Sequence, residues 1–426
     1  MSAVEIEAGV RLSRLANRLT VATESIPGVK TATVGVWVAA GSRHERPDEH
    51  GLSHLIEHMA FKGTARRSAR QIAEDIENVG GEINAATSTE FTSYSARVLG
   101  EDVGLAVDVL GDILTNSVFD AAELARERQV ILQEYASVED SPDDVVTDAF
   151  METAFANQAI GRPILGRPDT IVRFDGEAIR AFMAREYAPN RMVLAAAGDI
   201  DHDAVVWAAQ AALGGLPRTE APALGPAAYV GGERRIRRKL EQANLVIGFP
   251  GVSFRDPTYF ATHMFAQALG GGLTSRLWHE VRETRGLAYS VDAFHWPFTD
   301  CGLFGIGAGT SASDLAELVS VAIETARGAV AGLDPAELAR AKAQLKVAML
   351  AALETPGGRI ERAARQLLAW GRVISPEETV AHIDAVTLDE VRSAGARALG
   401  GPPTVAAIGP IAGLPPLARI ADRLAA

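Results

Sequence analysis

Runs of β-branched and apolar side chains near the start of the chain predict β-strands. Residues 19–26 and 30–42 are runs of this kind, and the second ends at Gly41 and Ser42, where a turn is expected. Residues 82–99 are rich in Ser and Thr and alternate apolar with polar positions, which predicts one or two further strands. This part of the chain is therefore expected to form a sheet.

Helical periodicity occupies the intervals between these strands. Residues 69–79 are amphipathic and stop at Gly80. Three helical stretches are expected within 102–157, and a helix at 176–187 leads into a strand at 191–200. Strands placed before and after long helical blocks predict an α+β fold, in which a mostly antiparallel sheet is covered by helices.

The second half of the chain repeats the first. Residues 119–126, FDAAELAR, match residues 333–340, LDPAELAR, and other matched segments keep an offset of about 210–214 residues in unbroken order. Chance similarity would not hold one register over half a chain, so we predict a tandem duplication. The two homologous α/β-sandwich domains are expected at 1–213 and 233–426, and the Gly- and Pro-rich residues 214–232 are expected to link them.

Composition and charge exclude several classes of protein. The 426 residues are 47% hydrophobic, and the net charge of −13 argues against nucleic acid or an anionic membrane as the main partner. One cysteine, Cys301, allows no intrachain disulfide and no Cys-rich zinc site. No apolar run approaches the length of about 18 residues that a membrane span requires. The acidic N-terminal residues do not resemble a secretory signal, so we expect a cytoplasmic protein.

His54, Glu57 and His58 form the central motif. A helix is expected from Pro47 onward, and residues four apart on a helix share a face, so His54 and His58 could bind one metal ion. Glu57 lies on the same side and suits a base acting on water, because H-x-x-E-H is the inverse of the H-E-x-x-H zinc-protease motif. Three alternatives remain open at this point: a chance pentapeptide, a surface pair of histidines, and His50 as a rival ligand.

The internal repeat indicates which half carries the chemistry. The second copy has His263 and Gln267 at the positions of the two histidines, without the glutamate. Glu127 and Glu134 of the first copy correspond to two alanines in the second. Two histidines leave zinc short of the three protein ligands of a catalytic site, and a carboxylate from this distant helix would complete the set. Plain surface charge is the alternative for either glutamate.

These residues resemble the pitrilysin/insulinase family of zinc metallopeptidases, nearest its branch of mitochondrial processing peptidase and similar bacterial proteins. That family has H-x-x-E-H followed by a glutamate 76 residues beyond the second histidine, which is Glu134 here, and a supporting glutamate seven residues earlier, matched by Glu127. Residues 51–64, GLSHLIEHMAFKGT, and residues 275–291 also match the family pattern. The dipeptide at 17–18, Asn-Arg, departs from a common Asn-Gly hairpin and concerns turn geometry alone.

The resemblance implies a role for each matched residue near the metal. His54, His58 and Glu134 would hold one Zn²⁺ per chain, and Glu57 would take a proton from water and pass it to the leaving amine. Glu127 would support the site without being a ligand. The implied activity is that of a zinc metalloendopeptidase.

The resemblance also implies how peptide is bound. Arg282 would anchor substrate carbonyls, and Tyr289 would donate to the developing oxyanion. Asn84 and Ala85 match an edge strand to which an extended peptide adds, and Phe61 would line a pocket there. Taken alone, Phe61 and Tyr289 are also typical of core packing, and Arg282 of a surface ion pair.

The expected substrates are short or unfolded peptides, because a folded protein offers no such strand. In the family an enclosed chamber forms between two halves, and a chain of this size supplies one half. The presence of both the metal motif and the Arg/Tyr pair favours a homodimer. A non-catalytic structural subunit of the same fold, and a peptide-binding module that turns over poorly, are the alternatives.

Overall fold

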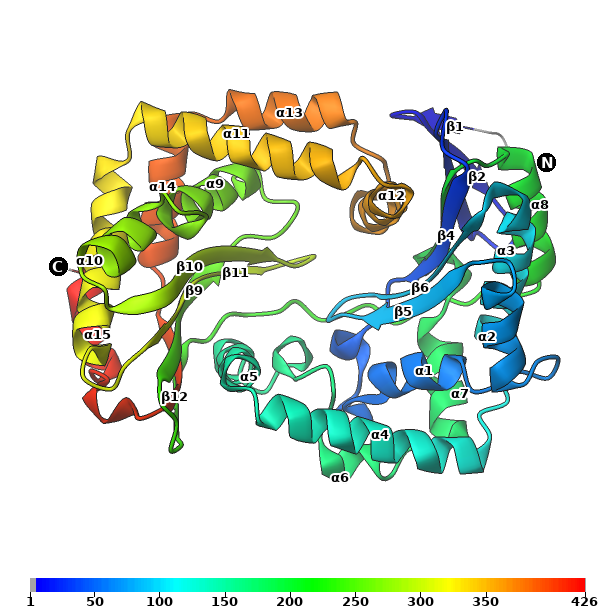
Figure 1. Ribbon diagram of the computed structural model, residues 1–426, viewed down its shortest axis with the longest axis horizontal. Coiled ribbons are helices and arrows are strands. Elements are labelled where there is room, and N and C mark those ends of the chain that lie inside the picture. Colours follow the sequence, from blue (N-terminus) through cyan, green and yellow to red (C-terminus); the bar gives the residue numbers. More distant parts are fainter. Residues whose placement is uncertain (1–4, 426) are drawn as a thin grey trace. The chain divides into compact units, whose positions relative to one another are not determined.

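The computed structural model describes residues 5–425 and divides into two compact units (Figure 1). The first unit contains the chain up to Tyr135, Pro163–Leu224 and Met349–Glu378. The second contains Ala136–Arg162, Gly225–Ala348 and Thr379 onward. Among the helices described between residues 5 and 425, none combines the length and the hydrophobicity of a transmembrane segment.

The first unit is built on a seven-stranded sheet in the order β1-β2-β3-β7-β4-β6-β5. All neighbours are antiparallel except β3 and β7, which are parallel. The region predicted at 82–99 forms two strands, as expected. The strands are β1 (Glu5–Glu7), β2 (Val10–Arg14), β3 (Thr20–Ser25), β4 (Thr31–Val38), β5 (Glu82–Thr87), β6 (Thr92–Leu99) and β7 (Met192–Gly198).

Helices of the first unit bury one face of this sheet in a large apolar core. Six helices from the first half of the sequence lie wholly within this unit, and a seventh, α4, continues beyond Tyr135 into the second unit. Figure 1 shows α3 and α8 on the sheet face opposite to α12. The helices are α1 (Leu52–Ala60), α2 (Ala69–Glu77), α3 (Val103–Thr115), α4 (Ala121–Glu139), α6 (Pro168–Ile171), α7 (Gly176–Glu186) and α8 (His202–Leu213).

The second unit repeats this plan with a five-stranded sheet in the order β10-β11-β9-β12-β8. Its one parallel pair, β12 with β8, stands where β7 and β3 stand in the first unit, so the topology confirms the tandem duplication. The strands are β8 (Gly232–Arg237), β9 (Ala243–Gly251), β10 (Ala288–Pro297), β11 (Gly302–Thr310) and β12 (Thr404–Gly409). Its helices are α9 (Tyr259–Gly270), a π-helix (Trp278–Thr284), α10 (Leu315–Gly332), α14 (Leu388–Leu399) and α15 (Leu417–Ala425). Helices α11 (Pro335–Ala352) and α13 (Pro376–Ala385) lie mostly in this unit and extend a few residues into the first.

The domain boundaries predicted at 1–213 and 233–426 differ from these units, because each unit includes a helix from the other half of the sequence. Helix α12 (Pro356–Trp370) places Ile360 and Ala364 against Trp37 and Val193, on the face of the first sheet opposite to α3 and α8 (Figure 1). The equivalent helix α5 (Pro142–Ala154) packs on the second sheet. Each sheet has two apolar faces, and its own helices cover one of them. The exchanged helix buries the other.

These features confirm the predicted class: α+β, with two tandem units of mixed, mainly antiparallel sheet covered by helices.

Candidate metal centre

Helix α1 presents His54, Glu57 and His58 on its exposed side because its other side is anchored in the core. Leu55 and Ile56 are buried there, whereas the three motif residues are only partly buried. An α-helix repeats every 3.6 residues, so this apolar stripe sets the direction in which the motif points.

The first turn of α1 is held by the buried carboxylate of Glu45. Its two oxygens accept hydrogen bonds from the backbone N–H groups of Gly51, at 2.9 Å, and Ser53, at 2.7 Å. A carboxylate at a helix N-terminus satisfies donors that the helix cannot pair itself. Gly51 must be glycine, since its φ is +94° and an added Cβ would lie 2.7 Å from the Cα of Gly166.

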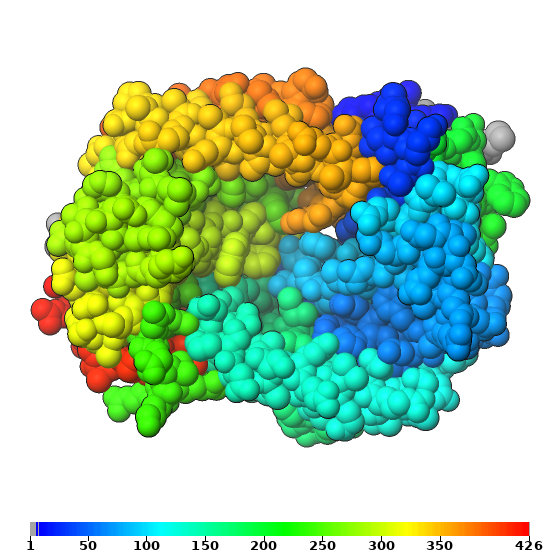
Figure 2. Space-filling view, in the orientation of Figure 1, coloured from blue at the N-terminus to red at the C-terminus, as the bar shows by residue number. Residues whose placement is uncertain are grey.

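Helix α4 supplies the carboxylates. Glu127 and Glu134 are seven residues apart, which is close to two helical turns, so both project from the same face. Only Leu124, Glu127 and Ile131 of this helix are buried, and the space-filling view shows α4 side chains on the outer surface of the molecule (Figure 2). Glu127 and Glu134 therefore lie on the side of α4 that carries its buried residues.

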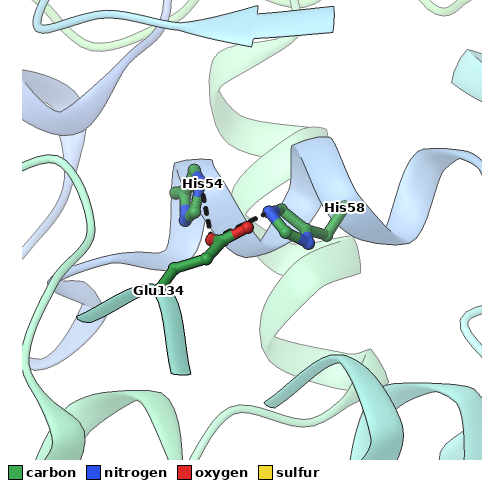
Figure 3. A group of neighbouring side chains, drawn as sticks. All are labelled: His54, His58 and Glu134. Atoms are coloured by element: carbon green, nitrogen blue, oxygen red, sulfur yellow. Dashed lines mark ion pairs between the residues drawn. The ribbon is translucent and has the colours of Figure 1, made fainter. Parts of the chain in front are cut away.

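The structure brings His54, His58 and Glu134 together (Figure 3). One Glu134 oxygen, Oε2, lies 3.4 Å from His58 Nε2 and 3.8 Å from His54 Nε2, and the three donor atoms lie within 4.8 Å of one another. Within residues 5–425, no other group of three His, Cys, Asp or Glu side chains is close enough to hold a metal ion. Helices distant in sequence therefore form one candidate site.

The donor atoms fit a zinc ion. Tetrahedral ligands at about 2.0–2.2 Å from zinc lie about 3.3–3.6 Å from each other, close to the separations of Glu134 Oε2 from the two imidazole nitrogens. This Oε2 is buried and has no hydrogen-bond partner among the described residues. A buried carboxylate oxygen without a donor is costly, and a cation bound to it and to the two imidazoles removes that cost.

The electrostatic environment keeps His54 neutral. Burial, and secondarily the neighbouring His58, lower the pKa of His54 to about 4. The ring is therefore uncharged near neutral pH and retains a nitrogen lone pair, which is the form that binds metals.

Glu127 orients His58 and is not one of the three clustered donors. Its Oε2 lies 3.0 Å from His58 Nδ1, and its Oε1 lies 2.7 Å from the ammonium of Lys62. Burial opposes ionisation of Glu127, but the hydrogen bonds from Lys62 and His58 outweigh it and lower its pKa. An ionised carboxylate only accepts, so His58 carries its proton on Nδ1 and leaves its Nε2 lone pair beside Glu134.

His50, considered above as a rival ligand, is not part of this cluster. Its Nε2 makes a hydrogen bond of 2.8 Å with the carbonyl oxygen of Pro163, and its side chain is buried. His50 is four residues before His54, but it does not share a helix face with it, because α1 begins only at Leu52.

The residues expected to bind peptide beside the metal lie on the first unit's edge strand. Asn84 is exposed and Ala85 half-buried on β5, which ends the sheet and pairs only with β6. Helix α1 packs against this strand. Phe61, just past α1, packs against the main core of the unit, so its predicted role in a pocket stays a prediction.

Arg282 and Tyr289 meet in the second unit. The Arg282 guanidinium stacks 4.5 Å from the centre of the Tyr289 ring and 4.1 Å from that of Trp278. It also donates a hydrogen bond of 3.0 Å to the Tyr289 carbonyl oxygen. Tyr289 is 78% exposed, which excludes the core-packing alternative for this residue.

The second unit has no equivalent metal cluster among its described residues. Gln267 of α9 donates to Gln344 of α11 at 3.0 Å and to the carbonyl oxygen of Gly271 at 2.8 Å. Ala341, the counterpart of Glu127, is buried. The helix pair that carries metal donors in the first unit is therefore joined by neutral amides in the second.

Sequence reasoning did not single out Lys62 or Glu45. Lys62 lies four residues after His58, and that spacing was the available signal. Glu45 precedes the helix by several residues in an irregular segment, and its role as a cap depends on the path of the chain.

Comparison with known proteins yields two family matches. The family described as Insulinase (Peptidase family M16) matches residues 20–168, and that described as Peptidase M16 inactive domain matches residues 173–345. An uncharacterised zinc protease of Streptomyces coelicolor is 41% identical over 412 residues, which cover 94% of this chain and 90% of that protein. Mitochondrial-processing peptidase subunit beta of Saccharomyces cerevisiae is 36% identical and covers 98% of this chain and 94% of its own.

Solved structures share the fold. A crystal structure described as a peptidase M16 inactive domain from Pseudomonas fluorescens superposes with a TM-score of 0.88 at 22% identity, covering 96% of this chain and 100% of that one. A chain of Complex III2 from Candida albicans superposes with a TM-score of 0.87 at 24% identity, covering 98% and 100%. At these identities the likeness concerns the fold alone.

Proposed function

We propose, from the premise that this chain belongs to the insulinase family of peptidases (family M16), that it is a zinc-dependent endopeptidase. Within the family it lies on the branch that includes mitochondrial-processing peptidase. The proposed substrates are short or unfolded peptides. The observation that carries the proposal is the cluster of His54, His58 and Glu134, which offers three donors of the types zinc prefers. We further propose one zinc ion per chain, held by these residues.

The proposed mechanism assigns the proton transfers to Glu57. Zinc, when bound, would lower the pKa of a water molecule from 15.7 to about 7 and so make hydroxide available near neutral pH. Glu57 takes the proton from the attacking water and delivers it to the departing amine nitrogen. Glu127 holds the His58 ring in place through its Nδ1 proton.

Substrate binding in this proposal uses the open edge of β5. An extended peptide that pairs with this edge, at Asn84 and Ala85, gains main-chain hydrogen bonds that depend little on its side chains. Loose sequence demands and a requirement for an extended chain both favour short or unfolded peptides as substrates.

A decisive test compares metal content with cleavage. The purified protein is expected to contain about one zinc per chain, by the coordination argument above, and to cleave a quenched unstructured peptide. Removal of zinc with a chelator should abolish cleavage, and readdition should restore it. Zinc without cleavage would support a peptide-binding module, and the absence of both would support a structural subunit. Either result contradicts the proposed function.

We also propose a homodimer in which Arg282 and Tyr289 contact substrate at the metal of the partner subunit. Arg282→Ala and Glu57→Gln chains, each inactive alone, are expected to regain about one quarter of wild-type activity when co-assembled, because half of the dimers are mixed and each has one intact site. A matched control mixes wild-type chains with the double variant, whose mixed dimers have no intact site. No regained activity in the first mixture, with activity above that of the wild-type homodimers in the control, contradicts action across the dimer.

A further inference from the structure

Lys62 extends the metal-facing side of α1 beyond the helix end. It lies one turn after His58 and two residues past Ala60, the last residue of α1. Its ammonium contacts Oε1 of Glu127 at 2.7 Å, while the other oxygen of the same carboxylate faces His58 Nδ1 at 3.0 Å. A single buried carboxylate therefore bridges Lys62 and a residue of the metal cluster.

Two contacts hold Glu127 in its observed orientation. The Glu127 side chain is only 8% exposed, so a carboxylate oxygen that loses its donor is left without solvent to replace it. Without Lys62, the carboxylate gains by rotating away from its observed orientation toward another donor. His58 Nδ1 then lacks a fixed acceptor, and its ring can place the proton on either nitrogen.

We propose that Lys62 is a positioning residue: by occupying Oε1 of Glu127 it fixes Oε2 on His58 Nδ1, and so keeps the Nε2 lone pair of His58 directed at the metal. The inference rests on the proposed metal site for its effect on zinc affinity. The effect of Lys62 on the His58 tautomer does not depend on bound zinc, and it can be measured in the metal-free protein.

A simpler reading treats Lys62 and Glu127 as an ion pair that contributes only to stability. The Glu127 side chain is 8% exposed and that of Lys62 30%, so loss of the pair should lower stability in either case. The two interpretations predict different effects of replacing Lys62. A positioning role predicts a change in zinc affinity and in the tautomer of the His58 ring, whereas a purely stabilising ion pair predicts neither.

The first experiment measures zinc affinity by competition with a chromogenic chelator. Lys62→Met is expected to weaken zinc binding by about 10–100-fold, the usual effect of removing such a supporting contact, and Lys62→Arg to recover part of the loss. Lys30→Met is the matched control, since Lys30 is an 86% exposed lysine of the same unit, 3.8 Å from Asp199. Unchanged affinity in Lys62→Met, or an equal loss in Lys30→Met, overturns the proposal.

A double-mutant cycle tests whether Lys62 affects zinc affinity through its contact with Glu127. In a Glu127→Ala background, Lys62→Met should have almost no further effect on zinc affinity, because the link to His58 is already lost. Additive losses overturn the proposal, since Lys62 would then act on the metal independently. Thermal unfolding of each variant checks that the fold is intact.

The second readout uses metal-free protein labelled with ¹⁵N at histidine. The His58 signals, assigned with His58→Gln, should report a single tautomer protonated at Nδ1 in the wild type and a mixture in Lys62→Met. One unchanged tautomer in both overturns the proposal. This measurement separates the two inferences: a wild-type protein that cleaves no peptide contradicts the proposed function, while the tautomer of the metal-free ring still decides the role of Lys62.

Discussion

Replacing Glu57 by glutamine is expected to reduce peptide cleavage by at least about 10²–10⁴-fold while zinc remains bound, because the amide cannot take a proton from water. Glu57 is not one of the three clustered donors, so the affinity for zinc should stay near that of the wild type. Glutamine has nearly the same shape as glutamate, which limits any effect on the packing of α1. The measurement pairs steady-state cleavage of a quenched peptide with zinc content.

Glu77→Gln provides the control for this variant. Glu77 is an exposed glutamate of α2 in the same unit, and its replacement should leave both cleavage and zinc content unchanged. A Glu57→Gln protein that still cleaves at more than about one tenth of the wild-type rate would remove Glu57 as the general base, given the size of effect expected for such a group. Loss of zinc from this variant would instead assign Glu57 to the coordination of the metal.

Glu134→Gln is expected to lose zinc and, with it, all measurable cleavage. Two imidazoles remain, one fewer than the three protein ligands of a catalytic zinc site. The neutral amide also removes the only negative charge among the three donors. Zinc content after dialysis, and cleavage in added zinc, measure the effect. Partial recovery at high zinc concentration is expected, since His54 and His58 still offer their nitrogens.

Two variants on the same helix separate this role from general effects of charge. Glu123→Gln alters a half-buried glutamate of α4 that pairs with Arg126, and it should retain full zinc content. Glu127→Gln should retain zinc at reduced affinity, because its contact is with His58 Nδ1 and not with the metal position. Equal zinc loss in Glu127→Gln and Glu134→Gln would contradict the distinction between a ligand and a supporting carboxylate.

The two units also show what a metal site requires beyond its fold. Both contain the same order of strands around one parallel pair, and in both a side-chain contact joins two helices that the internal repeat relates, α1 with α4 and α9 with α11. In the second unit, Gln267 and Gln344 bridge these helices as neutral amides, whereas the first unit has His58 and Glu127 in contact. The fold positions the helices, and the identity of a few side chains decides whether a cation is stabilised there.

The local chemistry of the motif could be predicted from sequence because it depends on helix geometry alone. His54 and His58 share a face at four-residue spacing in any helix, and the apolar residues between them decide which face is buried. Internal comparison of the two copies also identified Glu127 and Glu134, since both are replaced by alanine in the second copy. The tandem plan and the α+β class followed from the same repeat.

The exchange of α5 and α12 could not be predicted from the repeat. Helices α5 and α12 occupy equivalent positions in the two copies, and the sequence around each helix does not indicate which sheet it will cover. Apolar burial is non-directional, so Ile360 and Ala364 are satisfied by any complementary apolar surface. Only the folded chain decides that this surface belongs to the first sheet.

The sequence by itself determined the motif, its helix face and the duplicated plan, because these arise from contacts between residues close along the chain or from comparison of its two copies. Tertiary structure alone decided that Glu134 faces both imidazoles, that Glu127 bridges Lys62 and His58, and that His50 is bonded elsewhere. The first two outcomes depend on how α1 and α4 are placed relative to each other, and the third on where the chain brings Pro163 beside His50. These positions are set by the packing of the whole core and not by any local spacing.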